Sequence, residues 1–575
     1  MITRTPARTA LAPGAEWIRS APVWLCAAVL GIAIILAYAG SLRVPFLFDD
    51  ADAVVKNSTI RHFWSWEIFQ PPSNGSTTTG RPLLNAGFAL SYALSGDRPW
   101  SYHALNVALH ACAALLLFGL VRRTAVRAGV PRATSLAFAV AGLWALHPLG
   151  TETIVCVAQR TELQCGFFYL LTLYCFARGV DDSAAAWRWH SCSVLACLAG
   201  MATKEVMVTA PLLVLLYDRT FVARSFSGAW RARRGYYAAL AGTWLLLAAL
   251  VVGGGGARGV AAGFGRGVSA WSYLLTQCEA LVVYLRLALW PHPLVLDYGN
   301  AVVSSLADVW WQGLTIVVLL GLTIWALARR PVAGFFGACF FAILAPSSSV
   351  VPLVTQTIAE HRMYLPLAAL AAGVVVLAYR RLGGAAPWVL GLIAIGFAGA
   401  TFARVQIYQD EIALWQDNVA NRPNARAFTA LGVALLHAGR PADALPALEH
   451  ALALDPKNLT AARNRGLVLL QLGRADEAAA VLVPLPARDA GEADEFFALG
   501  NAFAREQKFA EAAAAYARTL ALDPAHAAAH ANLGNIRMLQ GRAREAIVEY
   551  EAALRLHPDD ARVRENLQLA RESVR

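Results

Sequence analysis

Long apolar stretches separated by short polar segments make up most of the chain as far as residue 402. About twenty apolar residues in a helix cross a bilayer, and we interpret eleven of these stretches as membrane spans. The predicted spans are residues 21–42, 102–121, 133–149, 153–177, 189–203, 206–217, 236–255, 307–328, 332–349, 363–379 and 386–402. The pattern therefore predicts an all-α chain with a polytopic membrane unit at 21–404, preceded by a cytoplasmic tail at 1–20.

Arginines concentrate in the short loops between alternate spans. The loops richest in arginine are 122–132, 218–235, 329–330 and 380–381. The positive-inside rule places all of them in the cytoplasm. This placement requires the apolar stretches 82–96 and 271–290 to lie along the outer surface or to fold back, and 189–217 to form two short passes. The predicted N-terminus is then cytoplasmic, and the first outer loop at 43–101 and the C-terminus are extracytoplasmic.

A repeat with a period of 34 residues follows the last span. Glycines recur at this spacing, at Gly432, Gly466, Gly500 and Gly534. An alanine lies 12 residues after each glycine, at Ala444, Ala478, Ala512 and Ala546. Small residues at these positions let two helices cross closely, as in tetratricopeptide repeats. We predict a linker helix at 405–424, four repeats at 425–558 and a capping helix at 559–575. The second repeat is degenerate, because "VPLPA" interrupts its second helix.

The formal net charge of +11 is unevenly distributed. Residues 1–404 hold 30 Lys+Arg and 16 Asp+Glu, whereas residues 405–575 hold 19 and 22. Basic charge confined to the membrane unit fits loops that set topology and argues against a nucleic-acid partner. All cysteines lie between Cys26 and Cys339 without a CxxC pair. The sequence therefore predicts neither a disulfide nor a metal site.

Three aspartates directly follow the first span, in the sequence "VPFLFDDADAV". Asp49, Asp50 and Asp52 lie in the loop that the arginine pattern places outside. A carboxylate on that side can take the proton from an acceptor hydroxyl. Solvation of the loop and capping of a helix that starts near residue 52 are the alternative roles.

Other polar residues gather at the predicted outer ends of further spans. They are His147, Glu152, Arg160, Lys204, Glu205, Glu360, His361, Arg362 and Tyr364. Charged side chains near lipid are costly, so they usually have partners or tasks. Arginine or lysine at this rim can bind the phosphate of a lipid-linked sugar and stabilise its charge as the glycosidic bond breaks. Structural ion pairs, snorkelling side chains and packed histidines are the alternative interpretations.

The order of the motifs resembles one known family along nearly the whole chain. The motifs are "FLFDD", "GRPLLN", "YHALNVALH", "HPLGTETIVCVAQRTEL", "KE", "WPHPLVLDY", "EHRMYLP" and "ALWQDNVANRPN". With tetratricopeptide repeats after them, they are similar to the transmembrane and tetratricopeptide-repeat O-mannosyltransferases. More distantly, the chain resembles the protein O-mannosyltransferases of the GT-C superfamily. It looks like a bacterial relative of these enzymes.

The resemblance implies a GT-C-like membrane fold, a polyprenyl-phosphate sugar as donor and a catalytic acidic motif in the first outer loop. In the protein O-mannosyltransferases that motif is Asp-Glu, with the Asp as base. By position, Asp49 takes the role of the base and Asp50 that of the second acid, and the Asp in place of Glu leaves open which of them acts. The implied donor-phosphate ligands are Arg81, Arg160, Lys204 and Arg362, and the supporting residues are His147, Glu152, Glu205, Glu360, His361 and Tyr364.

The resulting hypothesis is an inverting transfer of a monosaccharide, mannose or another hexose, from a polyprenyl-phosphate donor to a hydroxyl group. The expected acceptor is a protein Ser or Thr held by the repeats, at the outer face of a bacterial inner membrane. A membrane-anchored repeat scaffold without chemistry and a ligase for a whole lipid-linked glycan are the alternatives. A scaffold gives no reason for Arg160, Lys204 and Arg362 to gather at one rim.

Overall fold

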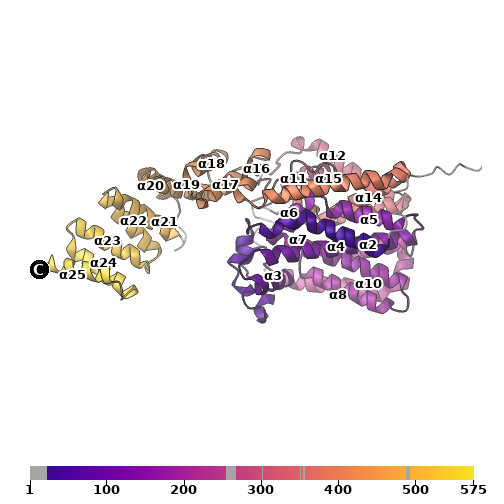
Figure 1. Cartoon of the computed structure of the whole chain (residues 1–575), viewed down its shortest axis with the longest axis horizontal. Coiled ribbons are helices and arrows are strands. Elements are labelled where there is room, and N and C mark those ends of the chain that lie inside the picture. Colours follow the sequence, from indigo (N-terminus) through magenta and orange to yellow (C-terminus); the bar gives the residue numbers. More distant parts are fainter. Residues whose placement is uncertain (1–21, 254–266, 301, 350, 354–355, 487–491) are drawn as a thin grey trace, which may run out of the picture. The chain divides into compact units, whose positions relative to one another are not determined.

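The chain folds into two compact units, Met1–Leu414 and Trp415–Arg575, in a computed structural model (Figure 1). The structure describes residues 22–253, 267–300, 302–349, 351–353, 356–486 and 492–575. Within these ranges the chain is helical and has no β-strand, as the apolar pattern predicts. The predicted tail at 1–20 lies outside the described residues.

The N-terminal unit is a bundle in which α5, α4, α7 and α8 pack side by side in that order (Figure 1). Its helices are α2 (Val23–Tyr38), α3 (Pro82–Ser95), α4 (Trp100–Arg127), α5 (Ala133–Ala145), α6 (Thr151–Val155), α7 (Arg160–Asp181), α8 (Ala186–Met201), α9 (Ala210–Phe221), α10 (Phe226–Gly253), α11 (Ala270–Leu289), α12 (Trp310–Arg329), α13 (Pro331–Leu344), α14 (Pro366–Leu382) and α15 (Ala386–Ile407). Proline occupies the first helical position of α3, α13 and α14. Its fixed φ suits that position, where its missing N–H would have no partner in the helix.

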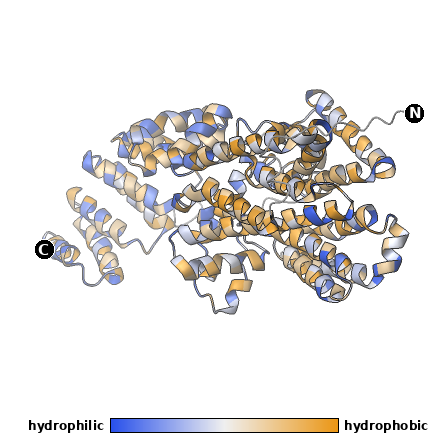
Figure 2. Cartoon of the chain, turned by 45° about the vertical axis from the view of Figure 1, so that its right-hand side comes forward, coloured by the Kyte–Doolittle hydropathy of each residue, from blue (hydrophilic) through white to orange (hydrophobic). Residues whose placement is uncertain are grey.

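Apolar residues cover the outside of this bundle as well as its inside (Figure 2). On α12, for example, Leu314, Val317 and Ile324 are 57%, 65% and 68% exposed. A contiguous apolar surface of this kind is unfavourable in water and is suited to the hydrocarbon of a bilayer. The N-terminal unit is therefore a multi-pass membrane unit.

The described helices that are long and apolar enough to cross a membrane number seven, or eight if the bent pair formed by α5 and the segment Pro148–Val155 is one span. The predicted number is eleven. The difference arises because α8, α9 and α13 are too short for this criterion and α14 and α15 are counted together, whereas α11 is included. The number of spans and their orientation stay predictions.

Helix α11 covers most of the stretch predicted to lie along the outer surface. Near its start, the Tyr273 hydroxyl donates to the carbonyl of Ser347, which follows α13 (2.7 Å). Near its end, the carbonyl of Ala288 accepts a hydrogen bond from Nε2 of His147, which follows α5 (3.1 Å). Both ends of α11 thus contact residues at the C-terminal ends of α5 and α13. This arrangement fits a helix that lies across one end of the bundle.

The C-terminal unit is a stack of antiparallel helix pairs. It contains most of α16 (Glu411–Asn421), the pairs α17 (Ala425–His437) and α18 (Pro441–Leu454), α19 (Leu459–Gln471) and α20 (Ala475–Leu482), α21 (Ala493–Arg505) and α22 (Phe509–Leu522), and α23 (Ala527–Leu539) and α24 (Ala543–Leu556), and finally α25 (Ala561–Glu572). A Cβ added to Gly432 would lie 2.5 Å from Leu448, and one added to Gly534 would lie 2.6 Å from Tyr550. The repeated glycines therefore permit the close crossing within each pair, as predicted. The short α20, of 8 residues, corresponds to the degenerate second repeat.

Candidate active site

Asp50 is fully buried and fixes the first loop to the segment before α7. Its Oδ2 accepts hydrogen bonds from the backbone N–H groups of Leu47 (2.9 Å) and Val157 (3.3 Å), and its Oδ1 accepts one from Ala158 (2.6 Å). Burial raises the pKa of Asp50 to about 7, although the three backbone donors act in the opposite direction. Because both oxygens are already bound to the backbone, this carboxyl group has a structural task.

Asp49 differs from Asp50 in that it is partly exposed. The preceding residue, Phe48, has a φ of 47°, in the left-handed region that costs a non-glycine residue about 1–3 kcal/mol. Such strain is concentrated at functional sites. Asp52 is exposed and pairs with Lys56 one helical turn away (3.0 Å), as expected of a solvated loop residue. Among these three aspartates, Asp49 alone combines partial burial with access to solvent.

Arg160 is completely buried, and its guanidinium group is bound to protein acceptors on every nitrogen. Nε donates to Asn106 Oδ1 (2.7 Å), Nη1 to the carbonyl of Gly87 (2.8 Å) and to Ser91 Oγ (3.1 Å), and Nη2 to the carbonyl of Tyr102 (2.8 Å). These bonds join α3, α4 and α7. The arrangement favours a structural role for Arg160 over the predicted phosphate contact.

Lys204 and Arg81 lie at the same end of the bundle and each pairs with a carboxylate. Lys204 forms an ion pair with Glu162, whose side chain is 9% exposed. Nη2 of Arg81 lies 3.3 Å from Glu205, and its Nη1 also donates to a backbone carbonyl. Both cations keep 13% of their side-chain surface exposed. They are therefore held in place and still reachable from outside the protein.

Glu152 and His361 form a buried pair that joins α6 to the start of α14. Nδ1 of His361 and Oε1 of Glu152 are hydrogen-bonded to each other (2.7 Å), and the backbone N–H of His361 donates to Oε2 (3.1 Å). Burial lowers the pKa of His361 to about 3, so the imidazole is neutral at pH 7. The charge of Glu162 opposes this shift, whereas Lys204 and Arg362 add to it. His361 is thus within electrostatic range of the Lys204–Glu162 pair.

Arg362 is almost completely buried behind this pair. Its Nη1 donates to the carbonyl of Thr357 (3.0 Å) and to the Tyr273 hydroxyl (3.4 Å), and its Nη2 donates to the carbonyl of Gln356. The side chain therefore orders the segment before α14 and holds α11 against it. A direct phosphate contact would require some of these bonds to be exchanged.

The first-loop acids and the Glu152–His361 pair lie close together. The Cys156 thiol interacts electrostatically with Asp49, Asp50 and Glu152, and interactions between charges fade over about 10 Å in physiological salt. Residues that are far apart in the sequence thus meet at one end of the membrane unit. Among the described residues, no group of three His, Cys, Asp or Glu side chains is placed to hold a metal ion.

Arg404, near the end of α15, belongs to this cluster although it is not among the residues predicted from the sequence. It is 8% exposed and interacts electrostatically with both Glu152 and Glu360. A signal was present in the sequence. Arg404 stands at the predicted outer end of the last span, where the distribution of the other arginines does not predict one.

Two of the predicted supporting residues are hydrogen-bonded to neighbouring protein groups. Nδ1 of His147 accepts from the backbone N–H of Leu149 (3.2 Å), and its Nε2 is bound to Ala288 as described above. The Tyr364 hydroxyl is bound to His110 (2.9 Å), and its carbonyl accepts from the indole N–H of Trp144 (2.7 Å). These contacts favour the packed, structural interpretation of both residues.

Glu360 is buried beside Glu152 and has its own set of donors. Its Oε1 accepts hydrogen bonds from the backbone N–H of Val295 (2.7 Å) and from the Tyr298 hydroxyl (2.8 Å). Burial is the largest cause that raises its pKa to about 8, and the charge of Glu152 adds to the shift. The folded state therefore keeps a proton on this carboxyl group in a pH range in which the unfolded chain has lost it.

We expect this proton to make the stability of the membrane unit depend on pH. The contribution of Glu360 is fully present below pH 4.5, the ordinary pKa of the group, and is lost as the pH rises through 8. Between these values the free energy of unfolding falls by up to about 1.4 kcal/mol per pH unit. Glu360→Gln keeps an acceptor at this position and should flatten the dependence, measured by denaturant titration at pH 5 to 8. The exposed Glu67→Gln is the control, and an equal flattening in it would contradict the assignment.

Comparison with family models identifies tetratricopeptide repeats in the C-terminal unit, independently of the fold. Two tetratricopeptide-repeat family models match the chain, one at residues 435–499 and one at residues 412–457 and 497–561. Solved structures that are similar to part of the chain include MamA from Desulfovibrio magneticus RS-1 (20% identity, 26% of this chain and 85% of that one, TM-score 0.24) and YrrB, a tetratricopeptide-repeat protein with an unusual peptide-binding site (21% identity, 31% and 90%, TM-score 0.25).

The curated relatives are protein O-mannosyl-transferases. Tmtc2 of Drosophila melanogaster is 29% identical over 313 residues, which cover 50% of this chain and 31% of the relative. Human TMTC2 is 30% identical over 205 residues, which cover 34% and 23%, and human TMTC4 is 29% identical over 221 residues, which cover 34% and 29%. The matched region thus spans less than a third of the length of each of these relatives. In sequence, this chain is similar to the Tmtc protein O-mannosyl-transferases, and it carries tetratricopeptide repeats at its C-terminal end.

Proposed function

We propose that this chain is an inverting glycosyltransferase of the GT-C type. It moves a monosaccharide, mannose or another hexose, from a polyprenyl-phosphate donor to a Ser or Thr hydroxyl of a protein. The observation that carries this proposal is the polar cluster at one end of the membrane unit. There a partly exposed carboxylate, Asp49, and the buried Glu152 both interact electrostatically with Cys156, and Glu152 in turn lies within electrostatic range of Arg362 and Arg404. The reachable cations Lys204 and Arg81 lie at the same end of the bundle, Lys204 within range of His361, the partner of Glu152.

The proposed reaction is a single displacement. The Asp49 carboxylate takes the proton from the acceptor hydroxyl, and the hydroxyl oxygen attacks the anomeric carbon of the sugar. A new carbon–oxygen bond forms as the bond from that carbon to the phosphate oxygen breaks. The bonding electrons and the negative charge leave with polyprenyl phosphate. Attack from the face opposite the leaving group inverts the configuration.

The donor phosphate is proposed to bind at Lys204 and Arg81. Each is held by a carboxylate and keeps part of its surface exposed, so a phosphate can approach it without unfolding the site. Charge-assisted hydrogen bonds to phosphate stabilise the leaving group most when its charge develops in the transition state. Arg362 and Arg404 lie behind them and contribute positive potential. Arg160 is left out of this set, because its nitrogens are bound inside the protein.

A protein acceptor is supported by two observations. The curated relatives are named as protein O-mannosyl-transferases, and tetratricopeptide repeats are protein-interaction modules. The proposed location is the outer face of a bacterial inner membrane, because the arginine-rich loops fall at the opposite end of the bundle from the cluster.

Mass spectrometry of envelope proteins from cells with and without the gene tests the proposal. The expected result is the loss of a hexose-sized modification from Ser or Thr residues, restored when the wild-type gene is returned. Loss of a whole oligosaccharide would indicate a ligase for a lipid-linked glycan. Unchanged glycosylation, together with lost partner recruitment, would indicate a scaffold without chemistry.

A further inference from the structure

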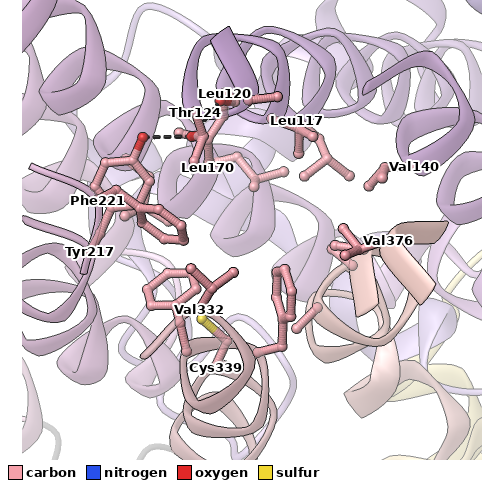
Figure 3. Close-up of a pocket in the computed structure, with 18 of the residues that line it drawn as sticks. Leu117, Leu120, Thr124, Val140, Leu170, Tyr217, Phe221, Val332, Cys339 and Val376 are labelled. Atoms are coloured by element: carbon pink, nitrogen blue, oxygen red, sulfur yellow. Dashed lines mark hydrogen bonds between the residues drawn. The ribbon is translucent and has the colours of Figure 1, made fainter. Parts of the chain in front are cut away.

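An apolar cavity of about 350 Å³ lies inside the membrane unit, between α4, α5, α7, α9, α13 and α14 (Figure 3). Leu117, Leu170, Val332, Cys339 and Val376 are among its lining residues. The hydroxyl groups of the lining are bound to other hydroxyl groups: Thr124 and Tyr217 bond to each other (2.6 Å), as the dashed line in Figure 3 shows, and Tyr169 bonds to Thr209 (3.1 Å). The cavity therefore offers apolar surface, which favours a hydrocarbon occupant over water.

The cavity is open at one end and closed at the other. At the open end Val130 and Val332 are 37% and 43% exposed, and Arg380 is exposed as well. At the closed end Tyr169, Ile343 and Leu365 are buried. The closed end lies toward the candidate active site, since Leu365 follows the "EHRMY" segment directly.

The depth of the cavity corresponds to one leaflet of a bilayer. Its apolar lining runs from Leu117 to Ala128 on α4, from Val332 to Ile343 on α13 and from Leu365 to Val376 on α14. Each stretch is about three turns of helix, or roughly 16 Å. Half of the hydrocarbon core of a bilayer is about 15 Å. Arg380 lies one turn beyond Val376, at the level where a lipid head group would follow an acyl chain.

The open end carries positive charge. Arg380 and Arg381 end α14, and Arg132 precedes α5, where it interacts electrostatically with Tyr379. Two acids on helices that line the cavity are paired with other arginines: Asp181 with Arg123 (2.8 Å) and Arg127 (2.5 Å), and Asp218 with Arg233 (2.8 Å). Within the described residues, Arg380, Arg381 and Arg132 form no ion pair, that is, no carboxylate oxygen lies within 4.0 Å of their nitrogens. The charge at the opening is therefore available to an anionic head group.

We propose that the cavity binds an anionic phospholipid from the leaflet at the Arg380 end. One acyl chain fills the cavity and the phosphate lies against Arg380. The bound chain joins α4, α5 and α7 to α13 and α14 and thereby supports the segment that carries Glu360, His361 and Arg362. A polyprenyl-phosphate donor is the less suitable occupant, because the cavity is closed toward the proposed catalytic end. The phospholipid site does not depend on the proposed reaction.

Lipid retention by the purified full-length protein tests this site. The protein is exposed to an equimolar mixture of phosphatidylglycerol and phosphatidylcholine with identical acyl chains, and the retained lipid is counted by native mass spectrometry. We expect one retained phosphatidylglycerol, enriched about fivefold over phosphatidylcholine, the effect of one cation near a membrane surface. Arg380→Gln should abolish the enrichment, and Arg381→Gln, which removes the same charge beside the cavity, should keep it.

A second pair of variants tests the cavity itself. Ala372→Leu places a larger side chain in the lining and should displace the retained lipid, whereas Ala371→Leu on the neighbouring position, outside the lining, should not. Equal retention of both phospholipids, equal effects of Arg380→Gln and Arg381→Gln, or lipid retained by Ala372→Leu would each overturn the proposal. So would preferential retention of polyprenyl phosphate when it replaces phosphatidylcholine in the mixture.

Discussion

Replacement of Asp49 by Asn should reduce sugar transfer by about 10²–10⁴-fold, the range in which a general base contributes to catalysis. Asn has the same shape as Asp and cannot take a proton, so the loss isolates the proton transfer from the fold. Asp49 is partly exposed and Asp50 is not, so the loop itself should remain in place. The measurement is the rate of hexose transfer from a polyprenyl-phosphate donor to a protein acceptor, with the purified variant in lipid.

Two neighbouring aspartates provide matched controls for this experiment. Asp52→Asn changes an exposed carboxylate in the same loop and should leave the transfer rate within about twofold, as expected away from the reacting atoms. Asp50→Asn removes a carboxylate that accepts hydrogen bonds from three backbone N–H groups. Because an amide has only one oxygen to accept them, the expected effect is lower stability. Full activity of Asp49→Asn would refute the assignment of the base. A loss of activity confined to Asp50→Asn, with its stability unchanged, would transfer the role to Asp50.

The architecture was predictable because it depends on patterns of short range. Apolar stretches of spanning length predict helices wherever lipid replaces water, since every backbone polar group must then be bonded within the helix. The spacing of Gly432, Gly466, Gly500 and Gly534 predicts the repeats, because each helix pair needs a small residue at its crossing. Neither argument requires knowledge of which distant segments meet.

The roles of individual charges were less predictable, because they depend on tertiary contacts. The sequence shows that Arg160 and Lys204 are basic residues at one rim, and it assigns both to phosphate. Only the fold shows that Arg160 is surrounded by acceptors from α3 and α4, whereas Lys204 keeps 13% of its side-chain surface exposed. For the same reason the sequence could not distinguish Asp49 from Asp50. Their difference in burial arises from the packing of Asp50 against Val157 and Ala158, which lie far along the chain.

Replacement of Arg160 by Lys should lower the free energy of unfolding of the membrane unit by about 3 kcal/mol or more. A lysine keeps the charge but has no planar fork, so it cannot reach Asn106, Gly87 and Tyr102 together. Each buried acceptor left without a donor costs about 1–3 kcal/mol. The measurement is a titration of the purified protein with sodium dodecyl sulfate in mixed micelles. Arg178→Lys in the same helix, where the guanidinium group lies over Trp189 and is partly exposed, should cost less than about 1 kcal/mol.

The same variant distinguishes the two roles considered for Arg160. A phosphate ligand at this position would tolerate lysine, because an ammonium group also binds phosphate as a point charge. Stability would then be unchanged, and the effect would appear as a higher KM for the donor. A structural guanidinium predicts the reverse pattern, with a large loss of stability and an unchanged KM in the molecules that remain folded. The bonds that tie Arg160 to α3 and α4 lead us to expect the second pattern, and a stable Arg160→Lys variant with a raised KM would return this residue to the donor site.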